Sequence, residues 1–207
     1  RDIGVTGVQT CALPISLNIA DKVVLSMASG LNLSGSGVSG AGALTGTGTA
    51  QYMGGVTLSA DSHVGAATGA QLTLTGAITG PHALAKVGAG TVVLSSANSY
   101  TLGTTIQEGT LTAGDAKALG DGVAKIYRGA TLNIADGKTL SLPGGLVFDP
   151  QLAPGAGAGA RGALTGTGTA QGGTGGVGGA ITLDTDAEVG GTGGTLTLTG
   201  EIGRAHV

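Results

Sequence analysis

Three carboxylates near the C-terminal end have a spacing that could support catalysis or metal binding. Asp184, Asp186 and Glu188 occupy alternate positions, and alternate residues of a β-strand project to the same face. Grouped acids can ligate Ca²⁺ or carry out the acid–base steps of glycoside hydrolysis. The matching positions in a duplicated copy of this segment hold Ser59, Asp61 and His63. Because only one acid recurs, we interpret the three carboxylates as solvated residues on an outward strand face, with a Ca²⁺ site as the weaker alternative.

Gly35, Gly37 and Gly40 reproduce the GxGxxG spacing of dinucleotide-binding loops. That loop needs a following helix, whose N-terminal amides hold the pyrophosphate. The residues that follow read AGALTGTGTA and show no helical periodicity. The sequence contains no GxxxxGK[ST], HExxH, CxxC or GxSxG motif. We therefore predict no cofactor, no resident metal and no catalytic residues, and we do not expect an enzyme.

The composition excludes several classes of protein. The 207 residues carry a net charge of −3 and are 10% charged, which gives no reason to expect a nucleic-acid partner. The chain has 44 Gly, one Phe, three Tyr and no Trp, so a compact core built on aromatic residues is not expected. Val, Leu and Ile are nevertheless abundant enough to argue against disorder. These totals favour many thin layers filled by aliphatic side chains.

Short runs in which Val, Leu or Ile alternates with Thr or Ser recur along the chain, and Gly or Asn separates them. Such runs predict β-strands joined by turns. The chain also contains a duplication, since GALTGTGTAQ occurs at Gly42–Gln51 and at Gly162–Gln171. We place the duplicated units at about 17–86 and 132–200. Strand–turn units that cannot bury their own apolar face must stack on one another, which predicts a parallel β-helix of about 20 residues per coil. The side chains expected to point inward are Leu94, Ile106, Leu111, Leu132, Ile134 and Leu140.

Residues 82–113, HALAKVGAGTVVLSSANSYTLGTTIQEGTLTA, resemble the passenger-associated strand repeat of bacterial autotransporters. The residues at the family's positions are Lys86, Gly88, Gly90, Thr91, Leu94, Asn98, Tyr100, Thr101, Gly103, Thr104, Thr105, Gly109, Thr110 and Leu111, together with Leu84, Ser95 and Ile106. The sequence departs from the pattern at Ser96 and Leu102, where the family usually has Gly. We interpret Asn98 and Tyr100 as structural corner residues, with the Asn satisfying backbone groups and the Tyr placing its hydroxyl in water.

The resemblance implies an all-β fold, a right-handed parallel β-helix of the pectin-lyase-like, autotransporter passenger type. It also implies export to the cell surface of a Gram-negative bacterium through a C-terminal outer-membrane β-barrel, which these residues do not include. We expect a β-helical stalk or an adhesin-like surface whose ligand is unknown; a glycan or protein of a host or neighbouring cell would fit. The alternatives are a β-helical polysaccharide-active enzyme and the stalk of a passenger whose catalytic domain lies elsewhere.

The two ends of the chain do not read as native protein. Residues 1–16 and 201–207 contain VTGVQTCALPI and EIGRAHV, which match translations of the two adapters of a common short-read sequencing library. Cys11, the single cysteine, lies in the first of these segments. We therefore expect the native segment to be 17–200 and exclude both ends from reasoning about the fold.

Overall fold

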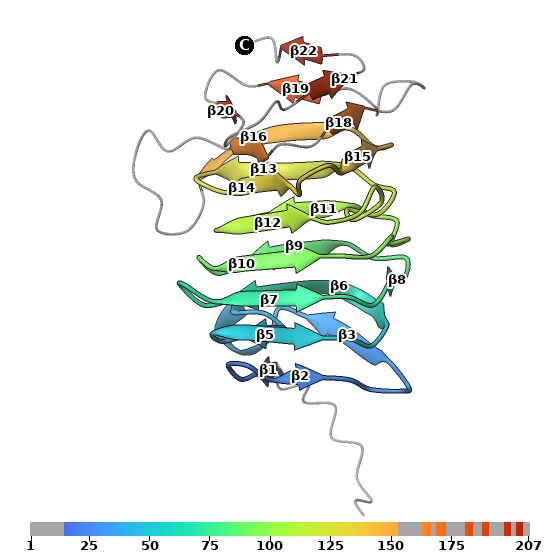
Figure 1. Cartoon of the computed structure of the whole chain (residues 1–207), viewed down its shortest axis with the longest axis vertical. Coiled ribbons are helices and arrows are strands. Elements are labelled where there is room, and N and C mark those ends of the chain that lie inside the picture. The colour runs from blue at the N-terminus through green and yellow to red at the C-terminus, as the bar shows by residue number, and fades with distance from the viewer. Residues whose placement is uncertain are drawn as a thin grey trace, which may run out of the picture.

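A computed structural model describes residues 15–152, 163–166, 169–172, 181–183, 188–190, 197–199 and 202–204. In this part of the chain the strands stack in parallel as successive coils of a β-solenoid (Figure 1). The strands β5, β7 and β10 run to the right at the front of Figure 1 while the chain climbs from bottom to top, which makes the coil right-handed. The predicted fold class, a parallel β-helix, is confirmed.

Three sheets form the walls of the solenoid. The first contains β1 (Leu17–Ile19), β3 (Leu31–Gly35), β4 (Leu44–Gly46), β6 (Val56–Ala66), β8 (Ile78–Thr79), β9 (Leu84–Val87), β11 (Thr104–Ile106), β13 (Ala124–Arg128), β16 (Leu146–Leu152), β19 (Ile181–Leu183) and β22 (Ile202–Arg204). The second contains β2 (Val24–Leu25), β5 (Thr49–Tyr52), β7 (Gln71–Leu74), β10 (Thr91–Leu94), β12 (Thr110–Ala113), β14 (Thr131–Ile134), β17 (Ala163–Gly166) and β20 (Glu188–Gly190). The third contains β15 (Thr139–Leu142), β18 (Thr169–Gly172) and β21 (Thr197–Thr199).

These sheets define three faces of the solenoid. The first face carries the path β1-β4-β6-β9-β11-β13-β16-β19-β22, and the second face carries the whole second sheet. The third sheet forms the third face in the later coils. In the earlier coils this third face is formed by β3, the first half of β6, and β8, because the 11-residue β6 passes from the third face to the first without a break.

In the coils around β11 the coil length has the expected value, whereas other coils are longer, since Leu17 pairs with Leu44, Thr131 with Ala163 and Leu146 with Ile181. Thr104 of β11 pairs with Leu84 of β9 and with Ala124 of β13, 20 residues away on either side. This spacing brings the same inward position of successive coils into one column. On the second face, one such column contains Ala50, Leu72, Val92, Leu111, Leu132 and Leu164. Each of these side chains is at most 1% exposed, so the columns form the hydrophobic core.

The predicted inward side chains are confirmed. Those of Leu94, Ile106, Leu111, Leu132, Ile134 and Leu140 are all at most 1% exposed. Within the described residues the only helix is η1 (Val38–Gly40), a single 3₁₀ turn. In that same part of the chain, no helix is long and apolar enough to cross a membrane.

The two copies of the duplication occupy different faces. The decapeptide that begins at Gly42 forms β4 on the first face, whereas its copy from Gly162 forms β17 on the second face. The upstream LNIAD copies shift in the same way, from β1 on the first face to β14 on the second. Each strand needs only the same alternation of inward and outward residues, so one sequence fits either face.

Candidate functional site

The residues of the family repeat form two neighbouring coils, from β9 to β12. Leu94 and Leu111 point into the core, while Thr91 and Thr110 lie on the outer surface of the second face. Gly88, Gly90 and Gly109 lie at the corner between the first and second faces, where the backbones of successive coils approach closely. A Cβ on Gly109 would lie 2.5 Å from the carbonyl oxygen of Gly90. These glycines therefore permit the close stacking of the coils.

Lys86 is a charged residue in an inward, otherwise aliphatic column. Its partners in register are Val64 on the preceding coil and Ile106 on the next. The side chain is fully buried. Its Nζ donates hydrogen bonds to the carbonyl oxygens of Val87 (3.1 Å) and Glu108 (2.8 Å) and to that of Gly88. The ammonium therefore satisfies three backbone carbonyls at the corner that the motif glycines form, and links one coil to the next.

The buried ammonium is destabilised by loss of water. Burial lowers the pKa of Lys86 to about 8, although the nearby Glu108 carboxylate acts in the opposite direction. A lysine whose pKa approaches neutrality can serve as a base or nucleophile where substrate can reach it. Here all three N–H groups of the Lys86 ammonium donate to backbone carbonyls. Lys86 therefore connects neighbouring coils of the solenoid and has a structural role.

The lowered pKa predicts how stability depends on pH. The unfolded chain keeps Lys86 protonated up to about pH 10.5, whereas the folded chain loses that proton near pH 8. Between these values the folded state binds fewer protons, so a rise in pH favours folding. At about 1.4 kcal/mol per pKa unit, the free energy of unfolding should rise by about 2 kcal/mol between pH 7 and about pH 9.5.

Urea melts at a series of pH values measure this contribution. Burial raises the pKa of Tyr100, and an unfolded tyrosine ionises near pH 10, so the series should stop below that pH. Lys86→Met should remove the rise, whereas Lys125→Met, at an exposed position, should keep it. Parallel pH profiles for the wild type and Lys86→Met would contradict the assignment.

Asn98 connects three successive coils at the corner that follows β10. Its Oδ1 accepts a hydrogen bond from the amide of Ile78 on the preceding coil (2.8 Å). Its Nδ2 donates to the carbonyl oxygen of Ala118 on the next coil (2.6 Å). The residue is only 3% exposed, so no water replaces either bond. The predicted role of Asn98 in satisfying backbone groups agrees with these contacts.

The expectation that Tyr100 places its hydroxyl in water is wrong. The residue is fully buried, and its hydroxyl lies 2.5 Å from that of Thr104. The Thr104 hydroxyl in turn donates to the carbonyl oxygen of Leu119 (2.9 Å). Thr104 also faces inward and is only 1% exposed. The turn at 115–119 passes over this corner, so its carbonyls supply partners for both hydroxyls.

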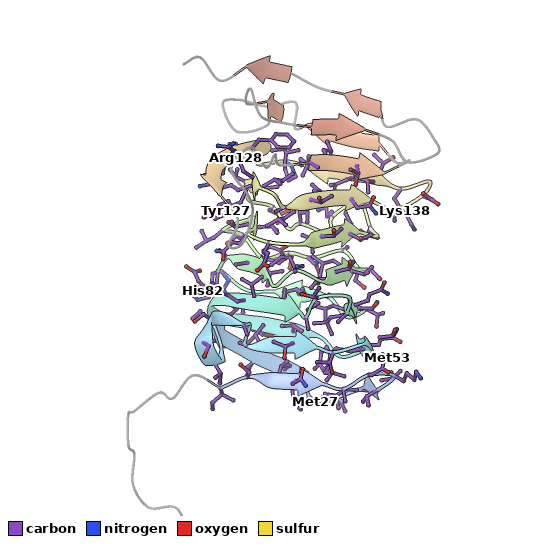
Figure 2. All side chains as sticks on the ribbon, turned by 90° about the vertical axis from the view of Figure 1, so that its left-hand side faces the viewer. Met27, Met53, His82, Tyr127, Arg128 and Lys138 are labelled. Atoms are coloured by element: carbon purple, nitrogen blue, oxygen red, sulfur yellow. The ribbon has the colours of Figure 1, made fainter. Side chains whose placement is uncertain are left out.

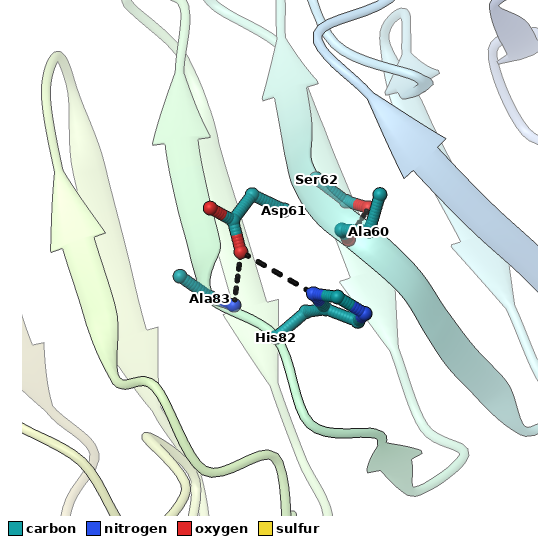
Figure 3. Close-up of polar contacts among 5 residues, drawn as sticks. All are labelled: Ala60, Asp61, Ser62, His82 and Ala83. Atoms are coloured by element: carbon teal, nitrogen blue, oxygen red, sulfur yellow. Dashed lines mark hydrogen bonds and ion pairs between the residues drawn. The ribbon is translucent and has the colours of Figure 1, made fainter.

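Asp61 and His82 form a contact between coils that resembles part of a catalytic triad (Figure 3). Asp61 Oδ1 lies 3.6 Å from His82 Nδ1 and accepts a hydrogen bond from the amide of Ala83 (2.9 Å). A Ser-His-Asp triad requires a serine hydroxyl hydrogen-bonded to the other imidazole nitrogen. The hydroxyl of the neighbouring Ser62 donates instead to the carbonyl of Ala60. The pair therefore anchors the β8–β9 turn to β6, and Ser62 does not complete a triad with it.

A surface cavity of about 350 Å³ lies beside the Lys86 corner. One of its walls is the loop that contains η1, and the other is the outer surface of two coils. Its lining residues are Ser39, Gly40, Ala41, Val87, Gly88, Gln107 and Glu108. Glu108 is the single carboxylate in this lining. No α-helix follows Gly40, so this loop does not have the architecture of a dinucleotide site.

The structure describes none of the side chains of the three acidic candidates. Asp184 and Asp186 are outside the described residues, and Glu188 is described only as the first backbone position of β20. Among the residues that the structure describes, no three His, Cys, Asp or Glu side chains cluster as metal ligands.

The sequence analysis does not predict that Lys86 is buried, although the sequence contains a signal for it. Leu84 and Lys86 are two positions apart in β9, and a strand that buries one of them must point the other inward too. A lysine at an inward position requires hydrogen-bond acceptors, and the glycines that follow make backbone carbonyls accessible to it.

Comparison with known proteins finds two sequence similarities. Residues 84–113 match the model of the passenger-associated-transport-repeat. A 91-residue stretch, 44% of this chain, is 41% identical to a protein named adhesin BmaC autotransporter from Brucella suis biovar 1 (strain 1330). The chain spans only about 2% of the length of that protein. No solved structure matches this chain.

Proposed function

Since this chain is an autotransporter passenger-like β-helix segment related to an adhesin autotransporter, we propose that it is part of an extracellular stalk that presents an adhesive surface. In the full-length protein, an outer-membrane translocator carries the segment to the cell surface. The stalk is non-catalytic and needs no cofactor. The observation that carries the proposal is the match of residues 84–113 to a passenger repeat within a continuous parallel solenoid.

The internal contacts support a structural role for the repeat. Its buried polar side chains, Lys86, Asn98 and Thr104, all bind backbone groups, several of them on adjacent coils. Satisfied buried polar networks stabilise one arrangement of neighbouring elements over others. A stalk needs this property, because each coil contacts mainly its two neighbours.

The competing function, a β-helical polysaccharide lyase or hydrolase, receives less support. Glycoside hydrolysis uses a pair of carboxylates on either side of the scissile bond. The cavity beside Lys86 offers only Glu108, and the exposed Asp61 is engaged with Ala83 and His82.

Surface display in a Gram-negative host tests the proposal. The 207-residue chain is fused between a signal peptide and a translocator barrel, and intact cells are treated with an external protease. We expect the chain to be cleaved from outside and to confer attachment to surfaces that cells with the barrel alone do not bind. Retention of a folded chain inside the cell would refute the export proposal. Efficient display without any gain in attachment would refute the adhesive role.

A further inference from the structure

The second face carries a regular array of hydroxyl groups. Two outward columns run along the solenoid, because residues paired in register on β5, β7, β10, β12 and β14 stack above one another. The threonines of these columns are Thr49, Thr73, Thr91, Thr110, Thr112 and Thr131. Most of the other outward positions carry Gln or Asn. Successive coils are about 4.8 Å apart, so the array repeats at that interval over five coils.

Most of these hydroxyls are available to a partner. Thr73 accepts a hydrogen bond from the Gln71 side chain (3.3 Å) and Asn133 accepts one from Thr165 (3.2 Å). In the part of the chain that the structure describes, the side chains of Thr91, Thr110, Thr112 and Thr131 make no hydrogen bond. Each is held on a strand whose inward neighbours are fully buried. A β-branched side chain also has few rotamers to lose, so ordering this surface on binding costs little entropy.

The second face is also free of charge over most of its length; at its end Glu188 of β20 pairs in register with Ala163. From β5 to β17 none of its outward positions is Asp, Glu, Lys or Arg. Charged residues flank this face: Arg128 ends β13 before β14 and Lys138 follows β14, and the two lie on opposite sides of Figure 2. A neutral surface between charged margins complements an uncharged partner and offers nothing to phosphate or carboxylate groups.

The kind of partner follows from these properties. Protein partners are usually anchored by buried aromatic or arginine side chains, and this face carries neither. A small molecule needs a concave pocket, whereas an open sheet face engages a partner only through many weak contacts in parallel. An extended polymer with neutral hydroxyl groups at regular intervals can make such contacts on every coil, and its affinity then grows with the number engaged.

We propose that the hydroxyl array of the second face binds the surface of an uncharged polysaccharide, with Thr, Gln and Asn side chains hydrogen-bonded to sugar hydroxyls. This inference rests on the proposed adhesive role and names its ligand class. Because no charge takes part, binding should survive high salt.

Co-sedimentation tests the inference with the full chain. The probes are microcrystalline cellulose, chitin and an insoluble β-1,3-glucan, with heparin and alginate beads as charged comparators. The test variant, Thr91→Val with Thr110→Val and Thr112→Val, removes three hydroxyls of the second face but keeps β-branched side chains. The matched control, Thr57→Val with Thr79→Val and Thr139→Val, makes the same change at exposed positions of the third face.

We expect the wild type and the control to sediment with at least one neutral polysaccharide at high salt, and the second-face variant to bind at least tenfold more weakly. Thermal melts establish that both variants fold. Unchanged binding by the second-face variant, an equal loss in the control, or binding to the charged beads alone would overturn the inference. The display experiment separates the two proposals. A displayed chain that attaches cells but binds no neutral polysaccharide refutes only the ligand class, whereas a purified chain that binds but is never exported refutes only the proposed function.

Discussion

Asn98→Ala should lower the free energy of unfolding by about 3 kcal/mol, because it leaves two buried backbone groups unpaired. The amide of Ile78 loses its acceptor, and the carbonyl of Ala118 loses its donor. Both groups are inside the solenoid, where the cost of an unmet hydrogen bond is not relieved by water. The loss should appear as a lower midpoint in urea, with little change in the slope of the transition.

Two further variants make this result specific. Asn98→Asp keeps the acceptor for Ile78 but places a second oxygen against the carbonyl of Ala118, so it should be at least as destabilising at neutral pH. Ser99→Ala changes an exposed neighbour and should stay within about 0.5 kcal/mol of the wild type. If Asn98→Ala unfolded at the same urea concentration as Ser99→Ala, Asn98 would not connect the coils.

Gly109→Ala should destabilise the chain by at least about 3 kcal/mol more than Gly137→Ala, because only the former overpacks the corner. Both glycines have positive φ, 63° at Gly109 and 66° at Gly137, so the backbone strain of an alanine is the same at either site, about 1–2 kcal/mol. The surroundings differ. A Cβ at Gly109 would meet the carbonyl oxygens of Gly90 and Gly88 at 2.5 and 2.6 Å, whereas a Cβ at Gly137 would meet nothing within 4 Å.

Urea melts of the two variants separate backbone strain from overpacking. Both variants carry the same strain from positive φ, so the difference between their free energies of unfolding reports the overpacking alone. Gly109→Ala should also move the carbonyls that hold the ammonium of Lys86, and thereby weaken the pH dependence of stability. Equal destabilisation by the two substitutions would mean that the repeat needs glycine at this corner only for its φ.

The sequence predicts the parts of the fold that depend on local alternation. Leu94, Ile106 and Leu111 lie inside because a strand places alternate residues on opposite faces, and the coil length follows from the repeat. Contacts between coils were less predictable. The burial of Tyr100 depends on the turn at 115–119, which packs over it from the next coil, and nothing local to Tyr100 indicates that.

The duplication illustrates a further limit of sequence interpretation. Its two copies lie on different faces because the chain between them does not complete a whole number of coils. Local alternation is the same on every face. The face on which a strand lies therefore depends on the lengths of all the turns that precede it. The interpretation of 1–16 and 201–207 as translated adapter remains a prediction. It concerns the encoding nucleotide sequence, and β22 shows only that residues 202–204 can pair with β19.

If the repeat is the architectural element of a stalk, the coils that contain Lys86 and Asn98 must be the hardest to open. Hydrogen exchange resolved along the chain measures this directly, because slow exchange identifies the amides that open only on global unfolding. We predict the greatest protection in β10 to β12 and in the amide of Ile78. We predict faster exchange in β1 and β2, each of which pairs with a single strand among the residues that the structure describes. Exchange at residues 84–113 as fast as at β1 and β2 would contradict a structural role for the repeat.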